Sequence, residues 1–115
     1  MSYDEGDILI VLFPYDECGE EKLRPALFWQ YKGGDYLFLS RITSASHNSE
    51  WEVEVMPSKE NGLTKRSYIR VDRTRKVHYS KVRNVIPIGR LEVDFMAVVK
   101  QRFKVFLQAS AHLCK

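Results

Sequence analysis

Residues 25–42 read PALFWQYKGGDYLFLSRI, two apolar runs joined by a short polar connection that contains Gly33 and Gly34. Glycine readily adopts the positive φ that a tight connection between two strands needs, so this segment predicts a β-hairpin of residues 26–31 and 36–42. Pro25 cannot donate a backbone hydrogen bond and is expected near the start of the first strand. The hairpin predicts a fold built on antiparallel strands.

Further strand patterns lie on both sides of this hairpin. Residues 7–13 (DILIVLF) form a β-branched, apolar run that stops at Pro14, and a polar turn is expected over residues 16–21. Residues 51–56 and 67–72 alternate apolar and polar side chains, which is typical of half-buried strands. Residues 57–65 are expected to form a loop, and residues 85–88 a shorter strand.

The last segment changes its period. Apolar side chains follow steps of three and four residues, which predicts an amphipathic helix of about 20 residues; they are Met96, Val99, Phe103, Phe106 and Leu113. Its apolar stripe can cover a small sheet or meet a partner helix, and covering the sheet is the more common use. The fold class is therefore mainly β with a C-terminal helix, as a strongly bent antiparallel sheet or small barrel.

Size and composition exclude several classes of protein. The chain has 115 residues, 44% hydrophobic and 29% charged, which predicts a single domain over residues 1–115. Its longest apolar run, residues 8–13, is too short to cross a membrane, and no export leader is recognisable, so a cytoplasmic protein without a membrane contact is expected. Neither the two cysteines nor the three histidines have metal-ligand spacing, and we expect no metal, disulfide or cofactor.

Charge is distributed unevenly along the chain. Residues 1–21 hold seven acidic side chains and no basic one, whereas residues 59–90 hold ten basic and two acidic ones. Such a basic block favours a polyanionic partner such as nucleic acid, although the same charges could pair with each other on a solvated surface. The cations expected to line a track for the phosphates of a nucleic acid are Lys65, Arg66, Arg73, Arg75 and Lys76.

Polar residues at strand ends are the candidates for chemistry. Arg24 directly precedes the strand that opens at Pro25, and Thr43 and Ser44 follow the strand that ends at Ile42. Arg70 and Asp72 are two residues apart on one strand, so their side chains share a face about 7 Å apart. A phosphodiester could fit across them, or they could form an ordinary ion pair.

Several short motifs occur together in one order: GDI at 6–8, FP at 13–14, KLRPAL at 22–27, ITS at 42–44, SYIRVD at 67–72 and GRL at 89–91. In this order and spacing the chain resembles the MazF/PemK-like toxins of type II toxin–antitoxin systems, over residues 6–107. The resemblance implies an SH3-like or CcdB-like β-barrel with a C-terminal helix that forms homodimers. It also implies a metal-independent endoribonuclease that cuts single-stranded RNA (mRNA) and is bound by a cognate antitoxin, with operator DNA contacted only through the antitoxin complex.

The resemblance also implies site residues. The arginine of the family's RP motif corresponds to Arg24 and the threonine of its ITS motif to Thr43, and an arginine and an aspartate of the PemK branch correspond to Arg70 and Asp72. The first loop, residues 15–21, carries acids in place of the histidine that some members have there. The resemblance therefore does not extend to the RNA sequence that is cut.

The residue types suggest how RNA would be cut without a metal. The 2′-OH attacks the adjacent phosphorus and leaves a 2′,3′-cyclic phosphate, which requires a base, a proton donor and cations that face the phosphorane. Asp72 is the best candidate for the base, Arg24 and Arg70 for the cations, and Thr43 for a hydrogen bond to a phosphate oxygen. The proton donor stays open, because an arginine releases a proton reluctantly.

Two alternatives of other classes remain at this stage. The first is an SH3-like binding module without catalysis, comparable to the CcdB toxins that bind gyrase through their C-terminal helix. The second is a degenerate toxin that binds only its antitoxin or operator DNA.

Overall fold

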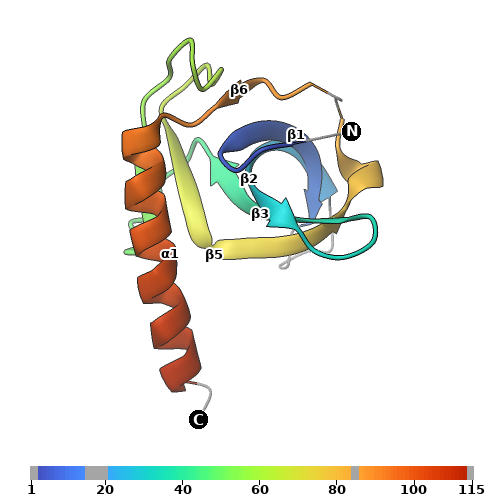
Figure 1. Cartoon of the computed structure of the whole chain (residues 1–115). Coiled ribbons are helices and arrows are strands. Elements are labelled where there is room, and N and C mark those ends of the chain that lie inside the picture. Colours follow the sequence, from blue (N-terminus) through green and yellow to red (C-terminus); the bar gives the residue numbers. More distant parts are fainter. Residues whose placement is uncertain (1–2, 15–20, 84–85, 114–115) are drawn as a thin grey trace.

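A computed structural model describes residues 3–14, 21–83 and 86–113 of the chain, and Figure 1 shows their arrangement. Within these residues one curled sheet lies against one long helix. The elements are β1 (Asp7–Pro14), β2 (Glu21–Tyr31), β3 (Tyr36–Thr43), β4 (Glu52–Val55), β5 (Ser67–His78), the 3-10 helix η1 (Tyr79–Lys81), β6 (Gly89–Arg90) and α1 (Val93–Leu113). The prediction of a mainly β fold with a C-terminal helix is confirmed.

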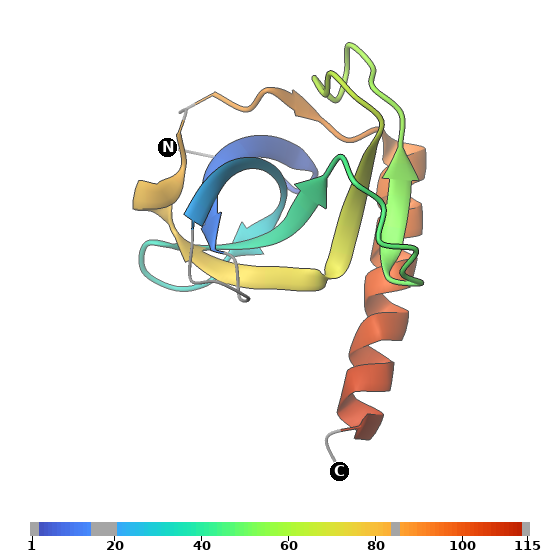
Figure 2. The same cartoon turned by 180° about the vertical axis from the view of Figure 1, so that it is seen from behind.

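The sheet has the strand order β4-β5-β3-β2-β1-β6, and all neighbouring strands are antiparallel. It curls so strongly that its two sides approach each other, as the view from behind shows (Figure 2). Val11 forms an isolated bridge to Val82, and the Arg83 N–H donates to the Ile10 carbonyl at 2.7 Å. The chain after η1 thereby returns to β1 and gives the sheet its half-barrel form.

The hairpin of residues 25–42 is present as predicted. Gly33 and Gly34 have φ values of 64° and 56°, so both connection residues need the left-handed conformation that glycine accepts at little cost. The register shifts between Phe28 and Gln30, which marks a β-bulge at Trp29. This bulge increases the local twist of β2 and contributes to the curl of the sheet.

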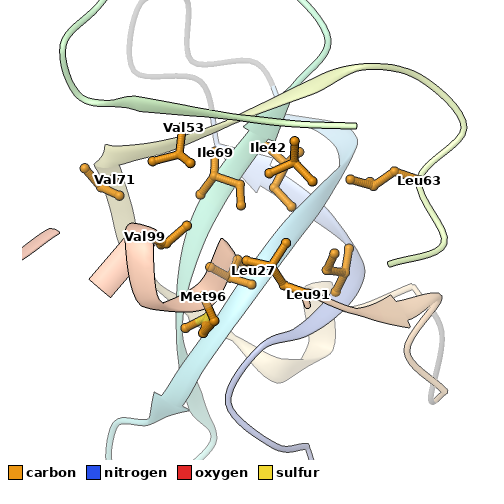
Figure 3. Packing of buried hydrophobic residues seen from close by; sticks show 11 residues of the cluster. Leu27, Ile42, Val53, Leu63, Ile69, Val71, Leu91, Met96 and Val99 are labelled. Atoms are coloured by element: carbon orange, nitrogen blue, oxygen red, sulfur yellow. The ribbon is translucent and has the colours of Figure 1, made fainter. Parts of the chain in front are cut away.

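Each face of the sheet packs its own apolar cluster. The cluster on the helix side contains Leu27, Ile42 and Ile69, with Val99 of α1 packed against them (Figure 3). The opposite face carries a second cluster around Leu9, Phe28 and Leu39, all at most 2% exposed. Because both faces are buried, strands β1–β3 read as nearly continuous apolar runs rather than as alternating ones.

Two strand boundaries and one short strand differ clearly from the prediction. Strand β2 begins at Glu21 rather than near Pro25, and β5 continues to His78 rather than ending at residue 72. The strand expected at residues 85–88 is wrong: residues 86–88 are not in a strand, residue 85 is outside the described residues, and β6 is formed by Gly89 and Arg90 instead. In all three places, pairing with a neighbouring strand outweighs the local preference. The acidic loop of residues 15–20 and both cysteines are outside the described residues.

The loop between β4 and β5 is fixed by Asn61 and Gly62. The fully buried Asn61 accepts from the N–H groups of Ser58 and Leu63, both at 3.0 Å, and donates to the Met56 carbonyl at 2.9 Å. Gly62 has a φ of 70°, and a Cβ placed there would meet the Ile88 carbonyl oxygen at 2.0 Å. The loop therefore needs both a left-handed conformation and close backbone approach at this position.

Gly62→Ala is expected to destabilise the fold by about 2–5 kcal/mol, because left-handed strain and a clash with backbone add together. Gly33→Ala is the matched control: its φ is also positive, but no atom lies within 4 Å of the added Cβ. Gly33→Ala should lower the free energy of unfolding by only about 1–2 kcal/mol. Urea denaturation of the two variants measures the difference, and equal losses would show that the close approach at Gly62 has no energetic weight.

Candidate phosphate-binding site

A pocket of about 210 Å³ lies where β2 begins and β3 ends. It is lined by Arg24, Pro25, Ile42, Thr43, Ser44, Leu63, Thr64, Lys65 and Ser67. Four of the predicted site residues thus meet in one place, although they come from three segments of the chain. Larger cavities of about 380 and 390 Å³ lie elsewhere. A further cavity of about 230 Å³ also has an arginine, a lysine and a serine in its lining (Arg83, Lys81 and Ser80), but none of these three was predicted as a site residue. The guanidinium, ammonium and hydroxyl groups of the first pocket together suit a phosphate.

The sheet and two short turns position the polar groups of this pocket. Arg24 lies opposite Val11 on β1, and Thr43 lies opposite Tyr68 on β5. The Thr43 hydroxyl oxygen accepts from the Ala45 N–H at 3.2 Å, which fixes the turn after β3. A hydroxyl that accepts through one lone pair can still donate its hydrogen, so Thr43 can donate to a phosphate oxygen.

Lys65 reaches the pocket on the loop that Asn61 organises. The Asn61 side-chain amide also donates to Glu92 near the start of α1 at 3.2 Å, so the helix supports the loop as well. Asn61 was not among the residues expected to matter, because the Asn-Gly pair predicts only a turn. Its role depends on burial and on partners far away in the sequence.

Arg70 and Asp72 contact each other directly. Arg70 Nε donates to Asp72 Oδ1 at 3.0 Å and Arg70 Nη2 donates to Asp72 Oδ2 at 2.8 Å, a two-bond fork. The two side chains are only 9% and 17% exposed, and neither lines the pocket. Of the two alternatives that the sequence left open for this pair, the structure shows the ion pair, because the two side chains close the gap between them.

Arg41 is a further cation near this fork, and none of the sequence motifs points to it. It lies opposite Arg70 on the neighbouring strand, and it shares a face of β3 with Thr43 two residues later. Like charges directly opposite one another destabilise a sheet unless anions compensate them. In the sequence, only the two-residue spacing from Thr43 could have indicated that Arg41 belongs to this site. The pairing of Arg41 with Arg70 is set by the strand register.

Glu52 supplies one of the compensating anions. It lies opposite Arg70 on β4, and its carboxylate accepts from the Ser46 hydroxyl and, at 3.1 Å, from the His47 N–H. Burial alone would raise the pKa of Glu52, but these hydrogen bonds and the charge of Arg70 outweigh it and lower the pKa below its ordinary value of 4.5. Glu52 thus ties the loop after β3 to the arginines of the sheet.

The remaining predicted RNA-binding residues lie on β5 or directly before it. Arg66 is exposed and pairs with Glu54 at 3.2 Å. Farther along β5, Arg73 and Arg75 are half-buried, and Arg75 donates to the Thr74 carbonyl at 3.1 Å. Lys76 lies over the ring of Tyr36, 4.8 Å from its centroid, near the far end of the strand.

Two other kinds of site were also sought in the described part of the chain. It contains no group of three or more His, Cys, Asp or Glu side chains placed to hold a metal ion. It also contains no helix that is both long and apolar enough to span a bilayer.

Comparison with known proteins identifies the family. A family model described as PemK-like, MazF-like toxin of type II toxin–antitoxin system matches residues 4–107. The chain belongs to this family. Comparison with curated protein sequences finds no match.

Solved structures of MazF-type toxins share its fold. MazF from Deinococcus radiodurans has a TM-score of 0.75 at 20% identity, with 94% of this chain and 98% of that chain covered. Mycobacterium tuberculosis toxin MazF-mt6 has a TM-score of 0.66 at 19% identity, with 84% and 91% covered. An endoribonuclease in complex with its cognate antitoxin from Mycobacterial species has a TM-score of 0.71 at 14% identity, with 93% and 96% covered.

For this MazF/PemK-like toxin we expect Glu52 to give a pH-dependent stability. Its folded-state pKa lies below the unfolded value, so its stabilising effect is complete above about pH 4.5 and is lost as the pH falls through the folded pKa. Glu52→Gln should therefore be less stable than the wild type at pH 7, and the gap should shrink below pH 4.5. Thermal unfolding between pH 7 and pH 3 measures this, and a constant gap would contradict the assigned role.

Proposed function

We propose that this toxin is a metal-independent endoribonuclease that cuts single-stranded RNA. The observation that carries the proposal is the convergence of Arg24, Thr43 and Lys65 on one small pocket. A pocket with two cations and a hydroxyl suits the phosphate of an RNA strand and the charge that develops on it during transfer. Membership of the MazF/PemK-like toxins supports the same activity.

The reaction begins with attack of the 2′-OH on the adjacent phosphorus. The new P–O bond closes a 2′,3′-cyclic phosphate, and the bond to the 5′-oxygen of the next nucleotide breaks. Arg24 and Lys65 stabilise the negative charge on the phosphorane oxygens, and Thr43 donates a hydrogen bond to one of them. DNA is not cut, because it lacks the nucleophile.

Two proton transfers accompany this step. Asp72 is the base that the sequence predicts, and it lies outside the pocket, so the ribose whose 2′-OH it deprotonates must extend from the pocket toward β5. Its two oxygens accept from Arg70 in the fork, and each retains a second lone pair for this proton. The fork orients the Asp72 carboxylate, which makes Arg70 a positioning residue. An ammonium releases a proton more readily than a guanidinium, so Lys65 is the better donor to the departing 5′-oxygen.

The partners follow from this activity and from the family. RNA enters as single-stranded mRNA, and a cognate antitoxin blocks the pocket; one of the similar structures is a complex of an endoribonuclease with its cognate antitoxin. The chain acts as a homodimer in the cytoplasm and contacts operator DNA only through the antitoxin complex.

A second candidate function is antitoxin binding without cleavage. The Arg70–Asp72 fork favours it, because both carboxylate oxygens already accept from Arg70 and neither residue lines the pocket. The experiment below distinguishes the two functions.

Cleavage of a long RNA by the purified protein should proceed fully in EDTA, because the nucleophile is the RNA's own 2′-OH and the cations are side chains. End-group analysis should find a 2′,3′-cyclic phosphate or its 3′-phosphate hydrolysis product. Activity that disappears in EDTA and returns with magnesium would contradict the mechanism. A protein that binds antitoxin but never cuts RNA would establish the second candidate.

Arg24→Ala and Thr43→Ala should each lower the cleavage rate by about 10²–10³, because each removes a donor to the phosphorane. Circular dichroism should show that both variants fold. Lys104→Ala is the matched control for loss of one positive charge, since Lys104 is exposed on α1 and lies outside the pocket. Near-wild-type cleavage by folded Arg24→Ala would place the active site elsewhere.

A further inference from the structure

A second pocket lies at the opposite ends of the strands from Arg24 and Thr43. It has a volume of about 380 Å³ and is lined by Tyr3, Tyr31, Gly34, Asp35, Leu37 and Tyr79. The strand register brings these residues together, because Tyr31 pairs with Leu37 and Leu37 pairs with Val77, shortly before Tyr79. Pockets of about 300–1,000 Å³ hold small molecules, so this one is large enough for a nucleotide-sized ligand.

Two of the tyrosine rings are exposed and yet fixed in place. Tyr31 and Tyr79 are 46% and 40% exposed. The Tyr31 hydroxyl accepts from the Tyr3 N–H at 2.7 Å, and its ring packs edge-on against Phe28 with a centroid distance of 5.1 Å. Aromatic rings held beside an open pocket are stacking surfaces for flat ligands, and their fixed position lowers the entropy lost on binding.

Asp35 places a carboxylate at the edge of this pocket. Its backbone carbonyl accepts from the Tyr79 N–H at 2.8 Å, which holds the turn against η1. Its side chain is 69% exposed, with Oδ2 4.0 Å from His78 Nε2. The adjoining Gly33 and Gly34 carry no side chains that could cover the opening, and no atom lies within 4 Å of a Cβ added at either. A carboxylate accepts from an amino group and repels a carbonyl oxygen, so Asp35 can distinguish flat ligands by their polar edge.

Basic side chains flank the tyrosines. The His78 ring packs against Tyr79 with a centroid distance of 4.8 Å and edge-on against Tyr36 at 5.2 Å. Lys76 lies over the ring of Tyr36, which His78 also contacts. Stacking rings beside cations are typical of surfaces that bind single-stranded nucleic acid, where bases stack and phosphates are held by charge.

We propose that this pocket binds a nucleobase that carries an exocyclic amino group. The base stacks against Tyr31 or Tyr79, and Asp35 accepts a hydrogen bond from the amino group. The site is separate from the phosphate-binding pocket and goes beyond RNA cleavage, because it binds a nucleotide whether or not the protein cuts RNA.

The test compares CMP with UMP, which differ only at positions 3 and 4 of the pyrimidine ring. Both are titrated into the full-length protein, and backbone amide NMR shifts are followed. CMP should shift residues 31–37 and 79 in a saturable way and bind at least about five-fold more tightly than UMP. Asp35→Asn should remove this preference, and Tyr31→Ala should weaken both nucleotides by about five-fold or more.

Leu107→Ala is the control for the loss of an exposed apolar side chain, because Leu107 on α1 is 50% exposed and does not line the pocket. It should leave the binding of both nucleotides unchanged. Equal affinities of the wild type for CMP and UMP would overturn the proposal, as would shifts confined to the pocket of Arg24 and Thr43. An antitoxin peptide that shifts residues 31–37 while CMP does not would assign the pocket to a protein partner and overturn it as well. None of these readouts depends on RNA cleavage, so this proposal and the proposed function can fail separately.

Discussion

The bend in β5 is the constraint on which the rest of the structure depends. Arg70 pairs with Arg41 of β3, and the next pair between these strands joins Thr74 and Ser40, so residues 71–73 have no partner on β3. Val71 in this bulge still has backbone partners: its N–H donates to the Trp51 carbonyl at 3.0 Å, and the Thr74 hydroxyl donates to its carbonyl at 2.7 Å. One strand can thereby pair with β4 before the bend and continue along β3 after it, and the sheet curls toward a barrel.

The same bend explains where charge is placed. Arg70 is 8% exposed, and a buried guanidinium is tolerated only when anions face it. Asp72 is available for this role because it lies in the bulge, and Glu52 because β4 pairs with β5 at that position. Arg70, the arginine of the SYIRVD motif, is therefore paired with neighbouring carboxylates, whereas Arg24 and Lys65 line the pocket. Position in the sheet, rather than residue type, separates the cation that is buried beside carboxylates from those that line the pocket.

The two ends of the curled sheet have different chemistry. At the end where β2 begins and β3 ends, cations and hydroxyls surround a pocket of about 210 Å³. At the other end, tyrosines and one carboxylate surround a pocket of about 380 Å³. Antiparallel pairing produces this separation, because it gathers the start of one strand with the end of the next. Residues far apart in the sequence, such as Thr43 and Lys65, become neighbours, whereas Arg24 and Tyr31 on one strand are placed in different pockets.

The sequence by itself determined the hairpin, the helix and the family. Gly33 and Gly34 predict their turn because only glycine readily takes positive φ, and the spacing of Met96, Val99 and Phe103 predicts a helix because one face must be apolar. Local patterns of this kind need no knowledge of distant residues. The tertiary structure alone decided that Arg70 and Asp72 close on each other, that Arg41 and Glu52 flank them, and that Asn61 supports the loop of Lys65. These features depend on strand register and on burial, which are set by contacts between residues that the sequence keeps far apart.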